Sequence, residues 1–308
     1  MILPSVIDAI GGTPLVELSR IRDELALEGR LLAKLDNLLP GYSKKDRAAR
    51  AVIEDARASG DLSEGQTVVE LTSGNMGTGL AIVCSVLGHP FVAVMSEGNS
   101  PERARMMRAL GAEVVLVPQA EGARPGEVSG ADLALVDKAA TRLTKERGAF
   151  RADQFRVPAN PRAHETGTAP EIWDQSGGSI TAFCDFIGSG GTLGGCARYL
   201  GPKGVRLYGV APERPDHPIQ GGGYGMPELA HLAQVDLAGT VTVSGHDARE
   251  NARRLARREG IFGGYSAGAN LAAAIDLLKG PERGGTVAFV VCDSGLKYLS
   301  TDLWEDAA

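Results

Sequence analysis

Short runs of apolar residues alternate along the chain with longer segments of helical periodicity. Six runs predict strands, at 67–71, 91–96, 113–118, 182–188, 206–212 and 286–293. Segments of helical pattern lie between them; one of these, 101–111, begins at Pro101 and ends at Gly111, as helices often do. Strands that alternate with helices over the whole length indicate an α/β protein with parallel sheets covered by helices.

We expect two such layers, packed together with a cleft between them. The polar, glycine-containing stretch at 119–131 predicts an exposed loop. The expected division places residues 35–146 in a smaller N-terminal α/β domain. A larger C-terminal α/β domain would comprise residues 1–34 and 147–308, with the active site in the cleft between the two domains.

The composition fits a soluble globular protein. The 308 residues are 43% hydrophobic and 23% charged, and the net charge is −6. No basic tract is present, so we expect no nucleic-acid partner. The N-terminus lacks a basic region followed by a long apolar run, and no apolar stretch is long enough to span a bilayer. These features predict a cytoplasmic protein without membrane contact.

The cysteines and histidines predict neither disulfides nor a metal site. None of Cys84, Cys184, Cys196 and Cys292 forms a C-x-x-C pair, and three of them lie in apolar runs. This pattern is typical of reduced, buried cysteines in a cytosolic protein. The five histidines show no metal-ligand spacing.

The segment "PGYSKKDRAARAVIEDA", residues 40–56, reads as a turn followed by a helix with Ser43 as its N-cap. Lys44 and Lys45 then lie at the positive end of the helix dipole, where each cation costs a few tenths to about 1 kcal/mol. One interpretation is that these are tolerated surface lysines. The other is a lysine whose pKa is lowered by burial and positive potential, so that its free amine forms a Schiff base.

A glycine-rich turn, "GSGGTLGG", follows the strand predicted at 182–188. Where small residues and a threonine lie at a helix start, the backbone N–H groups can point together at a phosphate. The turn matches neither G-x-x-x-x-G-K-[ST] nor G-x-G-x-x-G, which argues against a nucleotide triphosphate. A single phosphate on a small cofactor fits it best.

Three further strand-to-helix turns carry small polar residues, around 72–75, 263–266 and 293–294. Each one alone could be an ordinary helix cap. The turn at 72–75 offers hydroxyls, a side-chain amide and N–H groups that suit a carboxylate. Four such turns together with a helix-start lysine indicate pyridoxal phosphate, which needs an imine-forming lysine and a phosphate site.

At this point the chain resembles the cysteine synthase and cystathionine β-synthase family, the fold type II pyridoxal-phosphate-dependent enzymes. "PGYSKKDRAA" is similar to that family's P-G-G-S-x-K-D-R-x-A and "TSGNMGTGLA" to T-S-G-N-T-G-x-x-L-A. "GSGGTLGG" resembles G-T-G-G-T-x-x-G, and "GGYSAGAN" resembles G-x-S-S-G-A-A. Similar segments continue to "DSGLKYLST", so the resemblance covers the chain from about Gly11 to Thr301. It implies a two-domain fold like that of tryptophan synthase β, and a homodimer.

The resemblance implies a role for individual residues. Lys45 would be the catalytic, Schiff-base lysine, Asn75 would bind the cofactor's phenolic oxygen, and Ser266 would face its pyridine nitrogen. The phosphate loop would consist of Gly188, Ser189, Gly190, Gly191 and Thr192. The substrate would be bound by Thr72, Ser73, Gly74, Met76, Gln154 and, in "HPIQGGG", Gly221.

The activity implied is β-replacement on a β-substituted L-serine such as O-acetylserine, through an aminoacrylate, with sulfide as the default nucleophile. A neutral hydroxyl at Ser266 does not enforce a protonated pyridine ring, which suits elimination of a β-substituent. Met76 and Tyr42 depart from the family pattern, in which threonine and glycine are usual. Other reactions therefore stay open: amine addition as in diaminopropionate synthesis, homocysteine addition as in cystathionine synthesis, or serine/threonine dehydration. A cofactor-binding regulatory protein with little catalysis is the alternative from another class.

Overall fold

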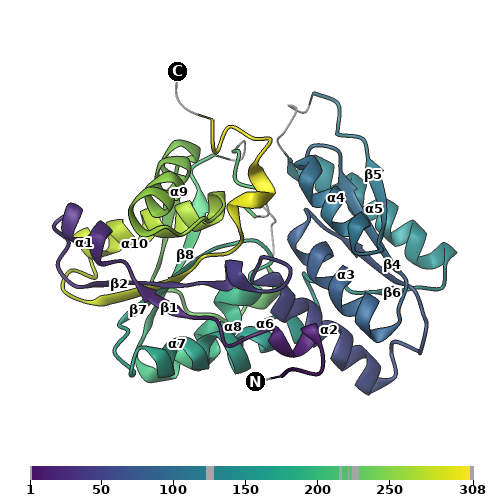
Figure 1. The fold of residues 1–308 in the computed structure, drawn as a ribbon, viewed down its shortest axis with the longest axis horizontal. Helices are drawn as coiled ribbons and strands as arrows, with labels where there is room; N and C mark the ends of the chain where they lie inside the picture. The colour runs from purple at the N-terminus through teal and green to yellow at the C-terminus, as the bar shows by residue number, and fades with distance from the viewer. Residues whose placement is uncertain (1, 123–127, 215–216, 221, 224–228, 306–308) are drawn as a thin grey trace.

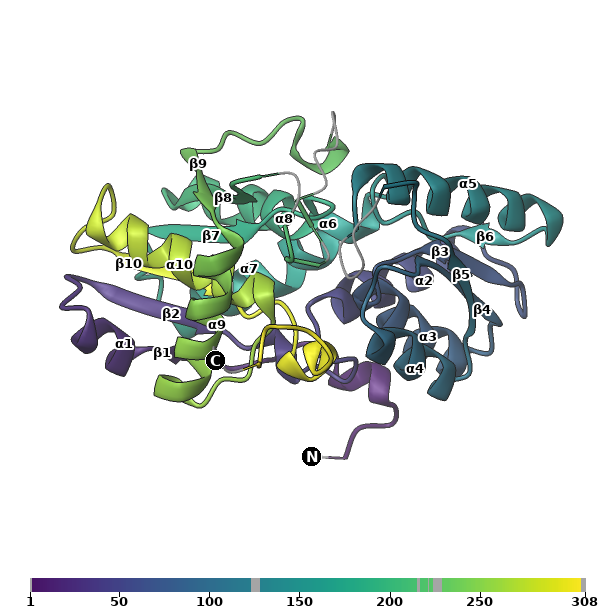
Figure 2. The same ribbon diagram turned by 90° about the horizontal axis from the view of Figure 1, so that it is seen from above.

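The computed structural model describes residues 2–122, 128–214, 217–220, 222–223 and 229–305. Gly221 and residues 123–127 of the expected loop lie outside the described residues. Two sheets flanked by helices form the structure, and they lie side by side in both views (Figures 1 and 2). The α/β fold with two parallel-sheet layers is thereby confirmed.

The larger sheet has six strands in the order β1-β2-β10-β7-β8-β9. Only the β1–β2 pair is antiparallel; the other described pairs in this sheet are parallel. Strands β7, β8 and β10 are those predicted from the sequence, although β7 and β10 end earlier than expected. The bounds are Leu15–Glu17 for β1, Arg30–Lys34 for β2, Ala182–Phe186 for β7, Arg206–Pro212 for β8, Gly239–Val243 for β9 and Thr286–Val290 for β10.

The smaller sheet has four strands in the order β5-β4-β3-β6, all parallel. Every residue of β3 and β4 is buried, as expected for parallel strands covered on both faces. β6 lies beyond the expected domain boundary at 146 and pairs with β3. The division into domains itself stays a prediction. The bounds are Val68–Leu71 for β3, Phe91–Ser96 for β4, Glu113–Val117 for β5 and Phe150–Arg151 for β6.

Helices cover both faces of each sheet (Figure 2). On the smaller sheet, α5 covers one face, and α2, α3 and α4 cover the other. On the larger sheet, α9 and α10 lie on one face, and α7 and α8 on the other. The bounds are Ser19–Glu24 for α1, Lys45–Ser59 for α2, Asn75–Leu87 for α3, Pro101–Ala109 for α4, Gly130–Glu146 for α5, Ala159–Ala163 for α6, Ala169–Gln175 for α7, Gly191–Leu200 for α8, Gly245–Glu259 for α9 and Tyr265–Lys279 for α10.

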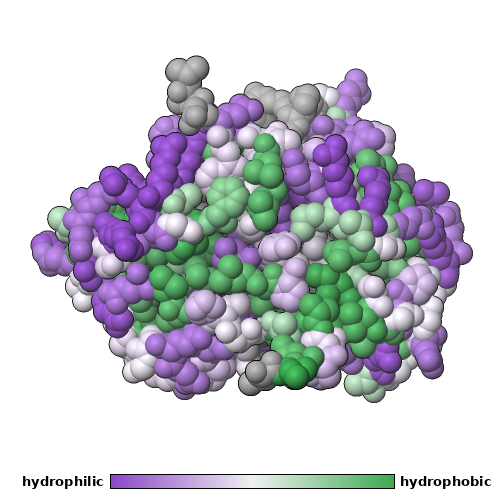
Figure 3. Space-filling view, in the orientation of Figure 1, coloured by the Kyte–Doolittle hydropathy of each residue, from purple (hydrophilic) through white to green (hydrophobic). Residues whose placement is uncertain are grey.

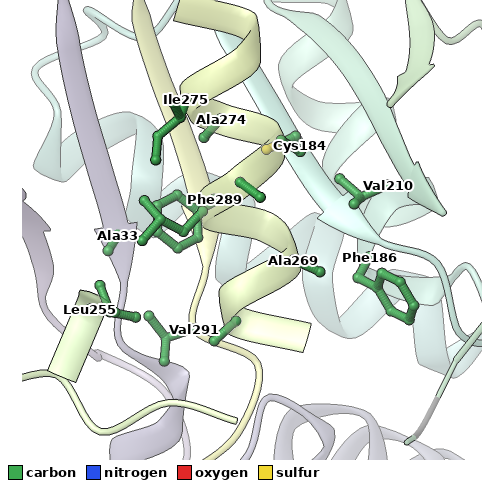
Figure 4. Packing of buried hydrophobic residues seen from close by; sticks show 14 of the residues in the cluster. Ala33, Cys184, Phe186, Val210, Leu255, Ala269, Ala274, Ile275, Phe289 and Val291 are labelled. Atoms are coloured by element: carbon green, nitrogen blue, oxygen red, sulfur yellow. The ribbon is translucent and has the colours of Figure 1, made fainter. Parts of the chain in front are cut away.

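Alternating side chains on buried strands supply the cores on the two faces of each sheet. Leu31 and Ala33 of β2 pack against the α9–α10 side, whereas Leu32 between them packs against the α7–α8 side. Figure 4 shows the first of these cores, in which Phe289 of β10 lies among aliphatic side chains from the sheet and from α10. Short helical turns lie between or beside these elements: η1 Val6–Ala9, η2 Asp36–Leu38, η3 His164–Thr168, η4 Gly201–Lys203, η5 Ala230–Leu232 and η6 Gly295–Tyr298.

Three local expectations were wrong. Ser43 does not cap α2 with its side chain; Lys44 is the cap residue, and Ser43 is buried against the segment after β10, where it pairs with Asp293. The loop expected to reach 131 ends earlier, because a reciprocal pair of hydrogen bonds between Ser129 and Asp132 starts α5 at Gly130. Ser266 lies inside the first turn of α10 rather than in a turn before it.

Candidate active site

One pocket brings together the N-termini of four helices. Its lining comes from the segments that begin α2, α3, α8 and α10, from the end of β7 and from residues after β10. Helix N-termini carry unpaired N–H groups and positive potential, which favour an anionic ligand. The lining residues are Lys44, Lys45, Asn75, Asp185, Phe186, Ile187, Gly188, Ser189, Gly190, Gly191, Thr192, Leu193, Gln220, Ser266 and Cys292.

The loop from Gly188 to Thr192 has the form of an anion cradle. None of its backbone N–H groups donates a hydrogen bond to another group in the described part of the chain. Gly190 has a φ of +81°, and a Cβ on Gly191 would come within 2.2 Å of the Asn160 amide. Larger residues at these two positions would strain or displace the loop. A phosphate bound there would satisfy donors that the fold otherwise leaves unpaired.

Asn160 and His164 support this loop from behind. Asn160 Nδ2 donates to Ser189 Oγ at 3.0 Å, and Thr192 Oγ1 lies 3.4 Å from His164 Nε2. Burial lowers the pKa of His164 well below its ordinary value, so its ring is neutral at neutral pH. The cradle therefore rests on neutral groups, and its attraction for an anion comes from N–H groups and the helix end.

Lys45 is the first residue of α2, and its amine reaches the same loop. Nζ donates to Ser189 Oγ at 3.1 Å, and the side chain is half-buried. Desolvation and the neighbouring Lys44 lower the pKa of Lys45 to about 8. The neutral fraction of this amine at neutral pH is a minority, but it is far larger than that of an ordinary lysine, so the amine can act as a nucleophile or base.

The other cations at this helix start are compensated. Lys44 Nζ donates to Asp185 Oδ2 of β7 at 2.5 Å. Arg47 makes charged hydrogen bonds to Asp36 and, through two nitrogens, to Glu171. Lys44 and Arg47 therefore form buried ion pairs, and the interpretation of this segment as tolerated surface lysines is wrong.

Asn75 begins α3, and hydrogen bonds fix the orientation of its amide. Oδ1 accepts from Lys297 Nζ at 2.8 Å, whereas Nδ2 donates to Asp293 Oδ2 at 2.7 Å. An amide nitrogen carries two hydrogens, and only one of them is used in this contact. Since Asn75 lines the pocket, its second N–H is available to an acceptor there.

Ser266 lines the pocket from the first turn of α10 and is buried. Cys292 lies on the same pocket, and burial raises the pKa of its thiol to about 12, so it is neutral. All four cysteines are free and buried, as predicted. Among the described residues no cluster of three His, Cys, Asp or Glu side chains could hold a metal ion, and no described helix is long and apolar enough to cross a membrane.

The expected substrate residues lie on the segments beside the pocket, but none of those described belongs to its lining. Thr72 Oγ1 accepts from the N–H groups of Gly74 and Gly77, both at 2.9 Å, and so orders the start of α3. Ser73 O accepts from Arg103. Gln154 Nε2 donates to Glu70 and to Leu71 O, each at 3.2 Å.

Met76 and Gly74 play different parts in the same turn. The Met76 side chain is buried in the core beneath α2 and α3, so only its backbone faces the turn. Gly74 has a φ of +124°, and a Cβ there would come within 2.6 Å of the Arg103 side chain. A glycine is therefore required at this position for α3 to begin where it does.

Sequence reasoning missed Asp185, Lys297 and the partnership of Lys44. One signal was available: Asp185 interrupts an otherwise apolar buried strand, and a charge in such a run needs a partner. Gln220 also lines the pocket and stands in the quoted "HPIQGGG".

Comparison with known proteins agrees with this geometry. The family model described as pyridoxal-phosphate dependent enzyme matches residues 6–293. A protein named cysteine synthase from Staphylococcus aureus (strain Mu50 / ATCC 700699) is 39% identical, over 97% of this chain and 96% of its own length.

Two solved structures are similar over nearly their whole length. An O-acetylserine dependent cystathionine β-synthase from Helicobacter pylori superposes with a TM-score of 0.91 at 31% identity, over 99% of this chain and 100% of that chain. An O-ureido-L-serine synthase superposes with a TM-score of 0.85 at 35% identity, over 100% of this chain and 98% of that chain. This chain belongs to the family of pyridoxal-phosphate dependent enzymes.

Proposed function

We propose that the protein replaces the β-substituent of an O-acetylserine-like amino acid with a nucleophile, sulfide by default, as a cysteine synthase does. The observation that carries this proposal is the meeting of Lys45, Asn75, Ser266 and the 188–192 loop on one pocket. These groups come from four segments far apart in the sequence. The relative named cysteine synthase supports the choice of reaction.

The residues of the pocket suit pyridoxal phosphate. The unpaired N–H groups of Gly188, Ser189, Gly190, Gly191 and Thr192 would hold the phosphate. The free N–H of Asn75 would donate to the phenolic oxygen, and the Ser266 hydroxyl would face the ring nitrogen without adding charge. Lys45 would hold the cofactor covalently through Nζ. When bound, the cofactor supplies a ring that stabilises negative charge at the substrate's Cα.

Lys45 would then move the proton at Cα. Its lowered pKa increases the fraction of neutral amine, which can accept this proton, and Ser189 Oγ holds Nζ beside the phosphate loop. The same amine, once protonated, can return a proton before product release. Ser266 and Cys292 are neutral, so neither would stabilise extra charge on the cofactor ring. Loss of the β-substituent would therefore be favoured over accumulation of that charge.

The substrate carboxylate would bind to the turn that begins α3. Thr72 Oγ1 accepts two N–H groups, which leaves its own O–H to donate. Ser73, Gly74 and the backbone N–H of Met76 complete the proposed site, at a helix N-terminus that favours an anion. Gln154 would join it by exchanging one of its present bonds, to Glu70 or to Leu71 O, for one to the substrate. Gly221, which lies outside the described residues, stays a prediction for the mouth of the site.

We further propose that the protein is cytoplasmic and forms a homodimer. We also propose that residues 35–146 form the smaller domain, and residues 1–34 and 147–308 the larger one. Apolar surface is spread across the middle of the face in Figure 3. Several large apolar side chains are exposed, including Ile2 at 98% near the N-terminus and Leu299 at 58% just after η6. Surface of this kind commonly mediates association. Four free, buried thiols accord with a reducing compartment.

The test is the absorption spectrum of the loaded protein during titration with O-acetylserine and then with sulfide. We expect the cofactor band to shift with O-acetylserine and to return with sulfide, and mass spectrometry to detect cysteine. Lys45→Ala should abolish the covalent band and reduce turnover at least 1,000-fold, because both bond and base are lost. Unimpaired turnover in this variant would contradict the assignment of Lys45.

The same samples separate the alternative reactions. Homocysteine or an amine donor in place of sulfide would give cystathionine or diaminopropionate, whereas elimination without a second nucleophile would give, after hydrolysis, an oxo acid and ammonia. Each product has its own mass. Homocysteine addition is supported by the similar structure described as an O-acetylserine dependent cystathionine β-synthase. A bound cofactor that responds to no β-substituted serine would instead favour a regulatory cofactor-binding protein.

A further inference from the structure

A buried ion pair lies in the same pocket as Lys45 and belongs to no role assigned above. Lys44 precedes Lys45 directly, and its ammonium is bonded to Asp185 near the end of β7. The two residues are 7% and 2% exposed, and both line the pocket. Burying two charges costs several kcal/mol per ion before their attraction is counted, so such a pair is weak evidence for a purely stabilising role.

The pair is held rigidly from the sheet side. Asn270 Nδ2 donates to Asp185 Oδ1 at 3.1 Å and to Val290 O at 2.9 Å. Cys292 Sγ lies 3.6 Å from the same carboxylate oxygen. Asp185 therefore has one oxygen for Asn270 and Cys292 and the other for Lys44, which fixes the position of the ammonium.

Among the described residues, the other titratable groups that face Lys45 are neutral or only partly ionised at neutral pH. They are Glu70 of β3, His164 of η3, His231 of η5 and Cys292 after β10. Burial lowers the pKa of both histidines and raises that of Cys292 to about 12, which leaves all three neutral. Burial also raises the pKa of Glu70 to about 7, so it is only partly ionised.

In the described part of the chain, the remaining groups that act on Lys45 are Lys44 and Asp185, which are bonded to each other. Of the two, Lys44 has the larger effect on the Lys45 amine. A cation in a desolvated pocket opposes a second cation much more strongly than it would in water.

We propose that Lys44, fixed by Asp185, is a positioning residue that increases the fraction of the Lys45 amine that is neutral and nucleophilic at neutral pH. This inference rests on the proposed function, because it concerns the loading of Lys45 with pyridoxal phosphate. In loading, the neutral amine adds to the aldehyde carbon and water leaves. A protonated amine has no lone pair for this step, so the loading rate reports the neutral fraction.

The experiment strips the full-length protein of cofactor and follows its reloading with pyridoxal phosphate by stopped-flow absorbance from pH 6 to 10. The wild-type loading rate should be half-maximal near pH 8. In Lys44→Met the unpaired Asp185 carboxylate favours the charged amine, so we expect a midpoint at least one unit higher and loading about tenfold slower at pH 7. Lys44→Arg, which keeps the cation, should restore the wild-type midpoint.

The double variant Lys44→Met/Asp185→Asn guards against a folding defect, because it removes both buried charges together. We expect its midpoint between those of wild type and Lys44→Met. The matched control is Lys138→Met, an exposed lysine on α5, which should leave the midpoint unchanged. The proposal would be overturned if Lys44→Met and Lys44→Met/Asp185→Asn both kept the wild-type midpoint. If only the double variant folds, a wild-type midpoint in that protein alone would overturn it.

Failure of the proposed function would look different. In that case the wild-type protein would not form the covalent band at any pH, or Lys45→Ala would form it equally well. Loading that depends on Lys45 but is indifferent to Lys44 would leave the function standing and refute the role of Lys44 alone.

Discussion

Tyr42 has a left-handed backbone conformation, with φ of +58°, two residues before Lys44. Its backbone O accepts from Ser294 N at 3.1 Å, and this contact ties the lysine segment to the turn after β10. A non-glycine residue in this region is strained by roughly 1–2 kcal/mol, which explains why a glycine is usual in the motif that this segment resembles. The side chain is 44% exposed.

We predict that Tyr42→Gly is more stable than Tyr42→Ala by about 1 kcal/mol. The two variants lose the same ring and differ only in the Cβ, so the comparison isolates backbone strain. Urea unfolding of both loaded proteins measures the difference. An alanine variant as stable as the glycine variant would show that the segment relaxes and stores no strain.

At the scale of single residues, sequence reasoning identified the groups that belong to local motifs. Lys45, Asn75, Ser266 and the glycines of the 188–192 loop all lie on the pocket. It missed groups whose meaning depends on a distant partner: Lys44 and Asp185 are 141 positions apart. Neither residue alone reveals the pairing, since a strand in one half and a helix start in the other must first be brought together.

Among the elements, α7 is connected to α2 and β2 through one carboxylate. Glu171 lies in α7 and forms ion pairs with Arg47 of α2 and Lys34 of β2, both at 2.7 Å. Although desolvation acts to raise it, the pKa of Glu171 is lowered to about 2 by these cations. The folded protein thus holds this carboxyl ionised where the unfolded chain would protonate it.

We predict that Glu171→Gln lowers the free energy of unfolding by about 2 kcal/mol at pH 7. The folded pKa lies below the unfolded one, so this stability is present above about pH 4.5 and is lost as the pH falls toward 2. Urea unfolding at pH 7 and pH 3.5 should therefore show a smaller gap at the lower pH. Glu165→Gln, which removes a more exposed pair with Arg198, is the matched control.

The strands that sequence reasoning missed are short or alternate in pattern. β6 has only two residues, and β9 reads G-T-V-T-V at the edge of its sheet. β2, in contrast, has four buried residues, but it pairs with β10, which lies more than 250 positions later. Apolar runs identify strands inside a regular strand–helix series; they do not identify the partner of an early strand.

Across the whole molecule, a buried network connects the segment after the larger sheet to the helices of the smaller one. Lys297 of η6 donates to Gly41 O at 2.7 Å and to Asn75 Oδ1 at 2.8 Å. Arg103 of α4 lies 3.6 Å from Asp293 and stacks over the Tyr298 ring. Charge from each half is therefore balanced by charge from the other.

We predict that Lys297→Met lowers the free energy of unfolding by about 3 kcal/mol, because it removes a buried cation that faces Asp46 and Asp293. Fluorescence and circular dichroism during urea unfolding measure the loss. Lys138→Met, at an exposed site, should change it by less than about 0.5 kcal/mol. A Lys297→Met protein as stable as this control would mean that the two halves are held together without the network.

The unpaired N–H groups of the 188–192 loop make the cofactor part of the folded state as well as part of the chemistry. A ligand that binds only the native chain stabilises it in proportion to the logarithm of its free concentration. The lifetime of this protein in a cell would then follow the supply of pyridoxal phosphate. Scarcity of the vitamin would reduce the amount of the enzyme, through turnover of unloaded chains, before it limited the rate of those that remain.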